Sequence, residues 1–98
     1  MTYKEQVKLI NYLIMKYNYQ KMEDNFRFYC FDSDLVVIID HVLAQLDHDS
    51  LRIIKNDFID KNVKFWWNEY YSKTTYYRLK NKAMTQFINC LHNRKMIL

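Results

Sequence analysis

The sequence predicts an all-α, small single-domain helical bundle of about five helices that ends in a C-terminal helix-turn-helix. Apolar residues recur at helical spacing along much of the chain, and 50% of all residues are hydrophobic, which is enough for a core. Gly and Pro are absent, so tight hairpins with positive φ at both central positions are disfavoured. A length of 98 residues suits one compact domain.

The first predicted helix spans Tyr3–Tyr19. Thr2, followed three residues later by Glu5, forms a capping-box pattern, in which each side chain accepts a hydrogen bond from the backbone amide of the other residue. The apolar residues that recur at helical spacing are Tyr3, Val7, Ile10, Ile14 and Tyr17.

The second predicted helix follows an aromatic connection. Residues 25–31 read NFRFYCF and alternate only in part, so a short helix or an irregular link is favoured over a short strand. Asp32 and Ser33 are candidate N-caps for a helix whose broad apolar stripe continues to Leu46. Residues 1–46 are therefore expected to brace the rest of the domain or to form a homodimer interface.

The third and fourth predicted helices are shorter. Asp47 or Asp49 can cap a helix that carries an apolar face and ends near residues 60–62. A short helix over about residues 63–70 follows, with unusual apolar bulk from Phe and Trp side chains. The first of its two adjacent tryptophans is expected to lie inside and the second to be partly exposed.

The last predicted helix begins after a Ser72 cap and continues to about His92. Its residues separate into two faces when they are placed at 100° steps. The residues expected to face the core are Tyr76, Leu79, Ala83, Phe87 and Cys90. The opposite, polar side carries Thr74, Arg78, Asn81 and Thr85, flanked by Lys73, Tyr77 and Lys82.

Charge is distributed unevenly within a net charge of +4. Between Phe31 and Asp60, seven aspartates face only Arg52 and Lys55, whereas no acid occurs from Ser72 onward. A purely basic end is typical of a polyanion-binding surface, although a solvated helix face has the same composition. The acidic stretch is expected to be a solvated face that repels DNA and so turns the basic end towards it.

The polar side of the last helix has the residue types of a recognition helix. Arg can pair with guanine and Asn with adenine, Thr can contact a base or a thymine methyl group, and Lys and Tyr can reach phosphates. The sequence therefore predicts a helix-turn-helix over about Phe65–Leu91, whose second helix enters the major groove. The alternative is a plain amphipathic helix that docks on the domain and leaves its polar side in water.

The run Ser72-Lys73-Thr74-Thr75-Tyr76-Tyr77-Arg78-Leu79-Lys80-Asn81-Lys82-Ala83 resembles the recognition helix of region 4 of bacterial sigma factors. It is more similar still to the ArpU and RinA group of phage-type transcriptional regulators, where Ser-x-x-Thr-Tyr-Tyr-Arg-x-Lys-x-x-Ala is typical. The resemblance covers about residues 35–91 and implies a sigma-region-4-like unit over residues 47–92. It places Lys73, Thr74, Tyr77 and Arg78 in the major groove and Tyr76, Leu79 and Ala83 in the core. Such proteins usually have Gly in the turn before the Ser, where this chain has Glu69-Tyr70-Tyr71.

The predicted function is that of a cytoplasmic, sequence-specific DNA-binding transcriptional regulator. Its expected partner is double-stranded DNA, with RNA polymerase and a second copy of the chain as further candidates. Residues 1–31 are too few for a domain that melts a −10 element, so a complete sigma factor is not expected. The alternatives are a protein-interaction module that binds RNA polymerase or another regulator without DNA contact, and RNA binding. The predicted DNA contacts are Lys73, Thr74, Tyr77, Arg78, Asn81 and Lys82.

Enzymatic, metal and cofactor roles are not expected. Cys30 and Cys90 have no second Cys or His at metal-ligand spacing, so they are interpreted as buried, inert thiols. A Gly-rich phosphate loop is excluded because the chain has no Gly. No apolar run approaches the roughly 20 residues of a membrane helix, and the first residues lack the uncharged core of a signal peptide.

Overall fold

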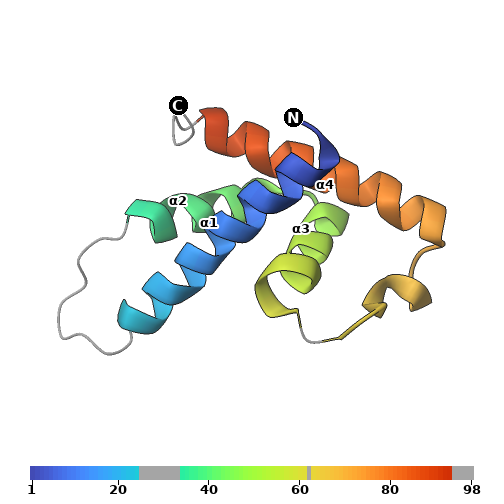
Figure 1. Ribbon diagram of the computed structural model, residues 1–98, viewed down its shortest axis with the longest axis horizontal. Helices are drawn as coiled ribbons and strands as arrows, with labels where there is room; N and C mark the ends of the chain where they lie inside the picture. Colours follow the sequence, from blue (N-terminus) through green and yellow to red (C-terminus); the bar gives the residue numbers. More distant parts are fainter. Residues whose placement is uncertain (25–33, 62, 94–98) are drawn as a thin grey trace.

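The computed structural model describes residues 1–24, 34–61 and 63–93. These residues are almost entirely helical and contain no strand, which confirms the predicted all-α class. Figure 1 shows α4 along one edge of the molecule, with α1, α2 and α3 packed against it and a short turn before its N-terminus. The elements are α1 (Tyr3–Asp24), α2 (Asp34–Gln45), α3 (His48–Ile54), η1 (Lys55–Asp60), η2 (Trp66–Glu69) and α4 (Lys73–Asn93).

The capping box of α1 forms as predicted. The Thr2 amide donates to Glu5 Oε1 at 3.0 Å, and the Glu5 amide donates to Thr2 Oγ1 at 3.2 Å. α1 begins at Tyr3 as expected but continues past the predicted end at Tyr19 to Asp24. α2 coincides with the predicted second helix. The predictions for residues 25–31 and for the caps Asp32 and Ser33 concern residues outside the described ranges.

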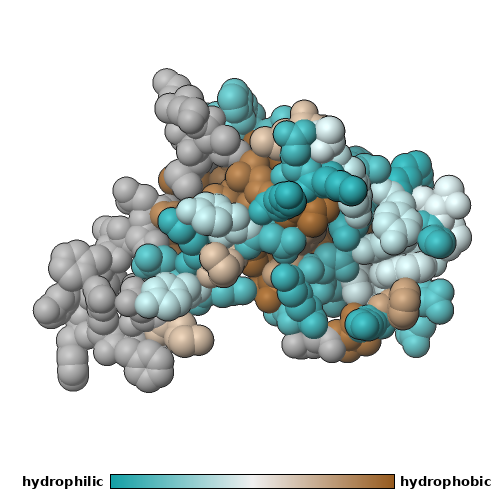
Figure 2. All heavy atoms as spheres, in the orientation of Figure 1, coloured by the Kyte–Doolittle hydropathy of each residue, from teal (hydrophilic) through white to brown (hydrophobic). Residues whose placement is uncertain are grey.

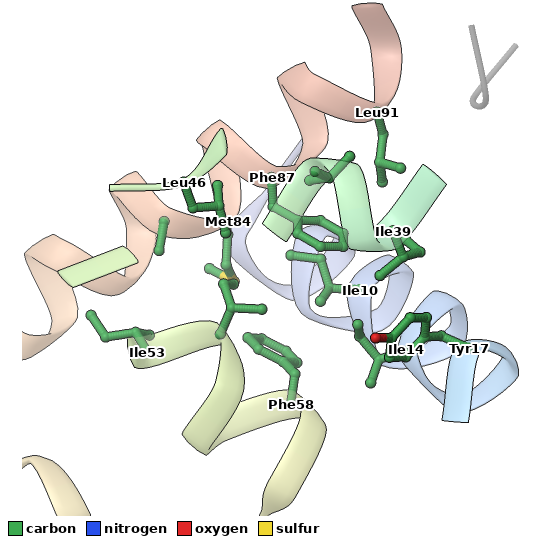
Figure 3. Close-up of a cluster of buried hydrophobic side chains, with 13 residues drawn as sticks. Ile10, Ile14, Tyr17, Ile39, Leu46, Ile53, Phe58, Met84, Phe87 and Leu91 are labelled. Atoms are coloured by element: carbon green, nitrogen blue, oxygen red, sulfur yellow. The ribbon is translucent and has the colours of Figure 1, made fainter. Parts of the chain in front are cut away.

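One hydrophobic core joins the four α-helices. Figure 3 shows side chains of α1, α2, α3 and η1 converging on Met84 and Phe87 of α4. Phe87 is fully buried, and burial of a side chain of that size contributes about 2–3 kcal/mol relative to exposure. The five residues of α4 that were predicted to face inward are all buried or half-buried: Tyr76, Leu79, Ala83, Phe87 and Cys90.

The predicted helix over residues 63–70 is wrong. A single 3-10 turn occupies its place, with a backbone bond of 3.0 Å from Asn68 N to Phe65 O. Two residues with left-handed backbone interrupt the helical path: Lys61, with φ 50°, ends η1, and Phe65, with φ 55°, precedes η2. The described part of the chain therefore has four α-helices rather than five, and a turn replaces the first helix of the predicted helix-turn-helix.

The third predicted helix ends where expected, but its second half is unusual. α3 continues without a break into η1, a π-helical segment that ends at Asp60. Such segments often occur at functional sites. Among the described residues, no helix combines the length and apolar character that crossing a bilayer requires.

Candidate nucleic-acid interface

The candidate recognition helix α4 begins at the predicted cap. The Thr75 amide donates to Ser72 Oγ at 3.2 Å, and the Tyr76 amide donates to Ser72 O at 2.8 Å. The Ser72 side chain thus satisfies one of the backbone amides that the first turn of a helix leaves unpaired. α4 then runs without interruption to Asn93, close to the predicted end at His92.

All six predicted contact residues are exposed. Within the part of the chain that the structure describes, the side chains of four of them make no hydrogen bond or ion pair: Lys73, Thr74, Arg78 and Asn81. Tyr77 is 42% exposed. Its ring packs edge-on with the Tyr76 ring, with the two ring centroids 5.0 Å apart. Figure 2 shows mainly hydrophilic and pale aromatic side chains at the end of the molecule where α4 begins.

Lys82 differs from the other five because it has a partner. Its Nζ lies 3.5 Å from Asp47 Oδ2, and both side chains are well exposed, at 57% and 42%. An exposed pair of this kind contributes at most about 1 kcal/mol, so Lys82 can exchange the carboxylate for a phosphate at small cost.

Lys80 points away from the candidate interface. Its Nζ lies 3.3 Å from Asp57 Oδ2, and the two side chains are only 15% and 12% exposed. The ammonium also lies over the rings of Phe58 and Tyr76, at 5.4 and 5.7 Å from their centroids. The charge of Lys80 is therefore used inside the domain.

Asp57, on η1, holds the turn and the first turns of α4 together. Besides Lys80, its carboxylate accepts hydrogen bonds from Trp66 Nε1, at 2.7 Å, and from the Tyr76 hydroxyl. The Trp67 ring stacks on the Tyr76 ring, with centroids 4.5 Å apart and planes 10° apart. Burial, followed by the bond to Asp57, raises the pKa of Tyr76 above its ordinary value, so the hydroxyl stays protonated and continues to donate.

Two further aspartates tie α3 to α4 and to the turn before it. Asp47 caps α3 by accepting from the Ser50 amide at 2.8 Å, and it accepts from Gln86 Nε2 of α4 at 3.1 Å. The bond from the Ser50 amide is the main cause that lowers the pKa of Asp47 to about 2. Asp49 accepts from the Tyr71 hydroxyl at 2.6 Å.

The acidic stretch is a solvated face only in part: among its described members Asp40, Asp47 and Asp60 are exposed, whereas Asp49 and Asp57 are half-buried. Its central members, Asp47, Asp49 and Asp57, bind side chains of α4 and of the turn before it. Their charges are partly neutralised by hydrogen bonds and ion pairs, and they fix α4 with its polar side outward.

The prediction missed two lysines of the loop before η2. Lys61 and Lys64 are exposed, and with Tyr77 and Phe65 they line one shallow hollow between this loop and the start of α4. A charge pattern read only along the last helix could not include them. They extend the basic surface from α4 onto the loop.

An exposed apolar edge lies beside this basic surface. Val63, Phe65 and Tyr70 are 65%, 69% and 58% exposed, and all three line a second hollow that also includes Arg52. The Arg52 guanidinium lies 4.7 Å from the centre of the Tyr70 ring, a cation–π contact.

The described residues offer no metal site, since no three His, Cys, Asp or Glu side chains among them are grouped to hold an ion. No family model matches the chain, and comparisons with curated proteins and with solved structures returned no match.

Proposed function

We propose that this protein is a sequence-specific DNA-binding transcriptional regulator that inserts the N-terminal half of α4 into the major groove. The observation that carries this proposal is the exposed side of α4, where the side chains of Lys73, Thr74, Arg78 and Asn81 make no hydrogen bond or ion pair with other described residues. The opposite side is fixed by the core and by three aspartates. The resemblance of residues 72–83 to recognition helices of phage-type regulators supports the same assignment.

The side chains of this surface divide into two groups by their chemistry. Arg78, Asn81 and Thr74 carry hydrogen-bonding groups suited to base edges in the major groove, which is about 12 Å wide and admits one helix. Lys73, Tyr77 and Lys82 flank them and suit the phosphates on either side of the groove. The loop lysines, Lys61 and Lys64, add two charges on the Tyr77 side.

The electrostatic arrangement favours a polyanion. α4 has no acid, and Asp47, Asp49 and Asp57 are engaged by Lys80, Lys82 and hydroxyl or amide donors, whereas Asp60 and Glu69 remain exposed. Repulsion between the three engaged aspartates and phosphates is reduced accordingly. Binding through exposed lysines and arginines should weaken steeply as salt concentration rises.

Selection of bound duplexes from a random library, followed by titration with the selected sequence, tests the proposal. Arg78→Ala should lose about 1–3 kcal/mol of affinity for that sequence and discriminate less between bases at one position. Asn89→Ala, at an exposed position near the other end of α4, serves as the control and should bind normally. Equal affinity of Arg78→Ala and wild type would contradict the assignment of α4 as the recognition helix.

A protein-interaction module is the second candidate, and the edge formed by Val63, Phe65 and Tyr70 favours it. An exposed aromatic edge of this kind suits RNA polymerase or another regulator better than it suits a phosphate backbone. Absence of binding to any duplex at about 50 mM salt would favour this candidate over DNA recognition.

A further inference from the structure

The helix α1 carries a second apolar stripe that the core does not use. Its inner side contributes the buried residues Ile10, Ile14 and Tyr17. On the outer side four large side chains are 50–62% exposed, and Figure 2 shows tan and pale side chains alternating along the helix there. They are Tyr12, Met15, Tyr19 and Met22.

The spacing of this outer stripe is that of a helix–helix interface. The steps between its members are three, four and three residues, which keeps all four on one line along α1. Single exposed apolar residues are normal on a protein surface, whereas a continuous line of four marks a contact site. The N-terminal continuation of the line is polar, with Lys4 and Lys8, so the contact site is confined to the second half of the helix.

The order of residues in the stripe is compatible with pairing between two copies of the chain. We infer that the outer stripe pairs with the same stripe of a second copy of this chain, with the two α1 helices antiparallel. Around a two-fold axis midway between Met15 and Tyr19, Tyr12 lies opposite the second copy's Met22 and Met15 lies opposite its Tyr19. Every Tyr then meets a Met, and sulfur–aromatic contacts are favourable. This self-complementarity is what a two-fold interface requires.

The size of the stripe sets the strength of the dimer. Large side chains of this kind bury about 150–250 Å² each when fully covered, so four half-exposed ones offer about 400 Å² per copy. A pair would bury about 800 Å² from the stripe alone, below the roughly 1,200 Å² of small specific interfaces. The dimer is therefore weak, with a dissociation constant of about 10 µM to 1 mM.

The first test is sedimentation equilibrium of the full chain without DNA over that range of concentrations. Met15→Lys places two ammonium groups at the centre of the interface and should weaken the dimer at least about tenfold. Asn89→Lys adds the same charge at an exposed position on α4 and should leave the dimer unchanged. A chain that stays monomeric up to about 1 mM, or a Met15→Lys variant that dimerises normally, would overturn the inference.

Salt separates this inference from the proposed function. Lys16 flanks the stripe, with its amine 5.1 Å from the centre of the Tyr12 ring, so salt screens repulsion between the two copies. Dimerisation should persist or strengthen at about 0.5 M salt, where DNA binding fails. Dimerisation lost in salt would contradict an apolar interface whether or not the protein binds DNA.

Cysteine cross-linking tests the orientation. In a background that carries Cys30→Ser and Cys90→Ala, Tyr12→Cys chains mixed with Met22→Cys chains should form mixed disulfides. Each variant alone should cross-link slowly, because its two copies of one position lie about 15 Å apart along the antiparallel pair. Faster cross-linking within each variant than between them would show a parallel pair and refute the antiparallel arrangement.

Discussion

Replacement of Asp57 by Asn tests whether this carboxylate holds α4 in place. The substitution keeps the size of the side chain but removes its charge and one of its two acceptor oxygens. Asn can still accept from Trp66 Nε1, but its amide group would then face the Lys80 ammonium and the Tyr76 hydroxyl, which Asp57 Oδ2 now binds. The lysine charge would remain at a side chain that is only 15% exposed, without its counter-ion.

The expected loss of stability follows from that geometry. Removal of one partner from a fully buried ion pair costs about 3–5 kcal/mol, so this largely buried pair should cost about 3 kcal/mol. In a domain of this size that corresponds to a fall in Tm of about 12–24 °C. Asp57→Asn combined with Lys80→Met removes the unpaired charge and should recover at least about 1 kcal/mol of the loss.

Urea unfolding followed by circular dichroism measures these differences. Asp60→Asn, an exposed position on the same segment η1, is the matched control and should change stability by less than about 0.5 kcal/mol. A loss below about 1 kcal/mol for Asp57→Asn would refute the view that this carboxylate anchors α4. A double variant no more stable than the single one would show that the unpaired lysine is not the source of the loss.

Three further substitutions test individual features. Phe65→Gly should be neutral or stabilise the fold by up to about 1 kcal/mol in thermal unfolding, because Gly adopts φ 55° without strain. Clear destabilisation would contradict the left-handed conformation of Phe65. Asp47, whose pKa is lowered to about 2, stabilises the fold above about pH 4, and this contribution is lost as the pH falls towards 2. Between about pH 4 and pH 2, Asp47→Asn should therefore lose less unfolding free energy than wild type. Equal losses in the two proteins would argue against the Asp47 contacts. The raised pKa of Tyr76 gives stability below about pH 10 that is lost as the pH rises further. In Tyr76→Phe the free energy of unfolding should therefore fall less steeply above about pH 10, and an unchanged fall would show that other groups cause it.

Local patterns in the sequence predicted the four α-helices and the caps of α1, α3 and α4. The capping box of Thr2 and Glu5 and the caps Asp47 and Ser72 involve groups within four residues of one another, so short sequence windows contain them. The two sides of α4 also follow from sequence spacing alone, since a helix with one apolar stripe has only one way to bury it.

The turn before α4 depends on distant contacts and could not be predicted in the same way. Neither Lys61 nor Phe65 is a residue type that indicates left-handed backbone, and the cost of about 1–2 kcal/mol at each must be offset elsewhere. The contacts of Trp66 with Asp57 and of Trp67 with Tyr76 can offset this cost. The inward direction of Lys80 could not be predicted either, because its partner Asp57 lies on another element.

The most direct test of the central proposal is an NMR titration of the labelled protein with a selected duplex at low salt. Amide signals should shift most at residues 73–82 of α4 and at Lys61 and Lys64, with little change along the outer stripe of α1. The shifts should disappear at about 0.5 M salt, because phosphate contacts dominate affinity. Absence of shifts at α4, or shifts confined to the edge of Val63, Phe65 and Tyr70, would contradict DNA recognition by this helix.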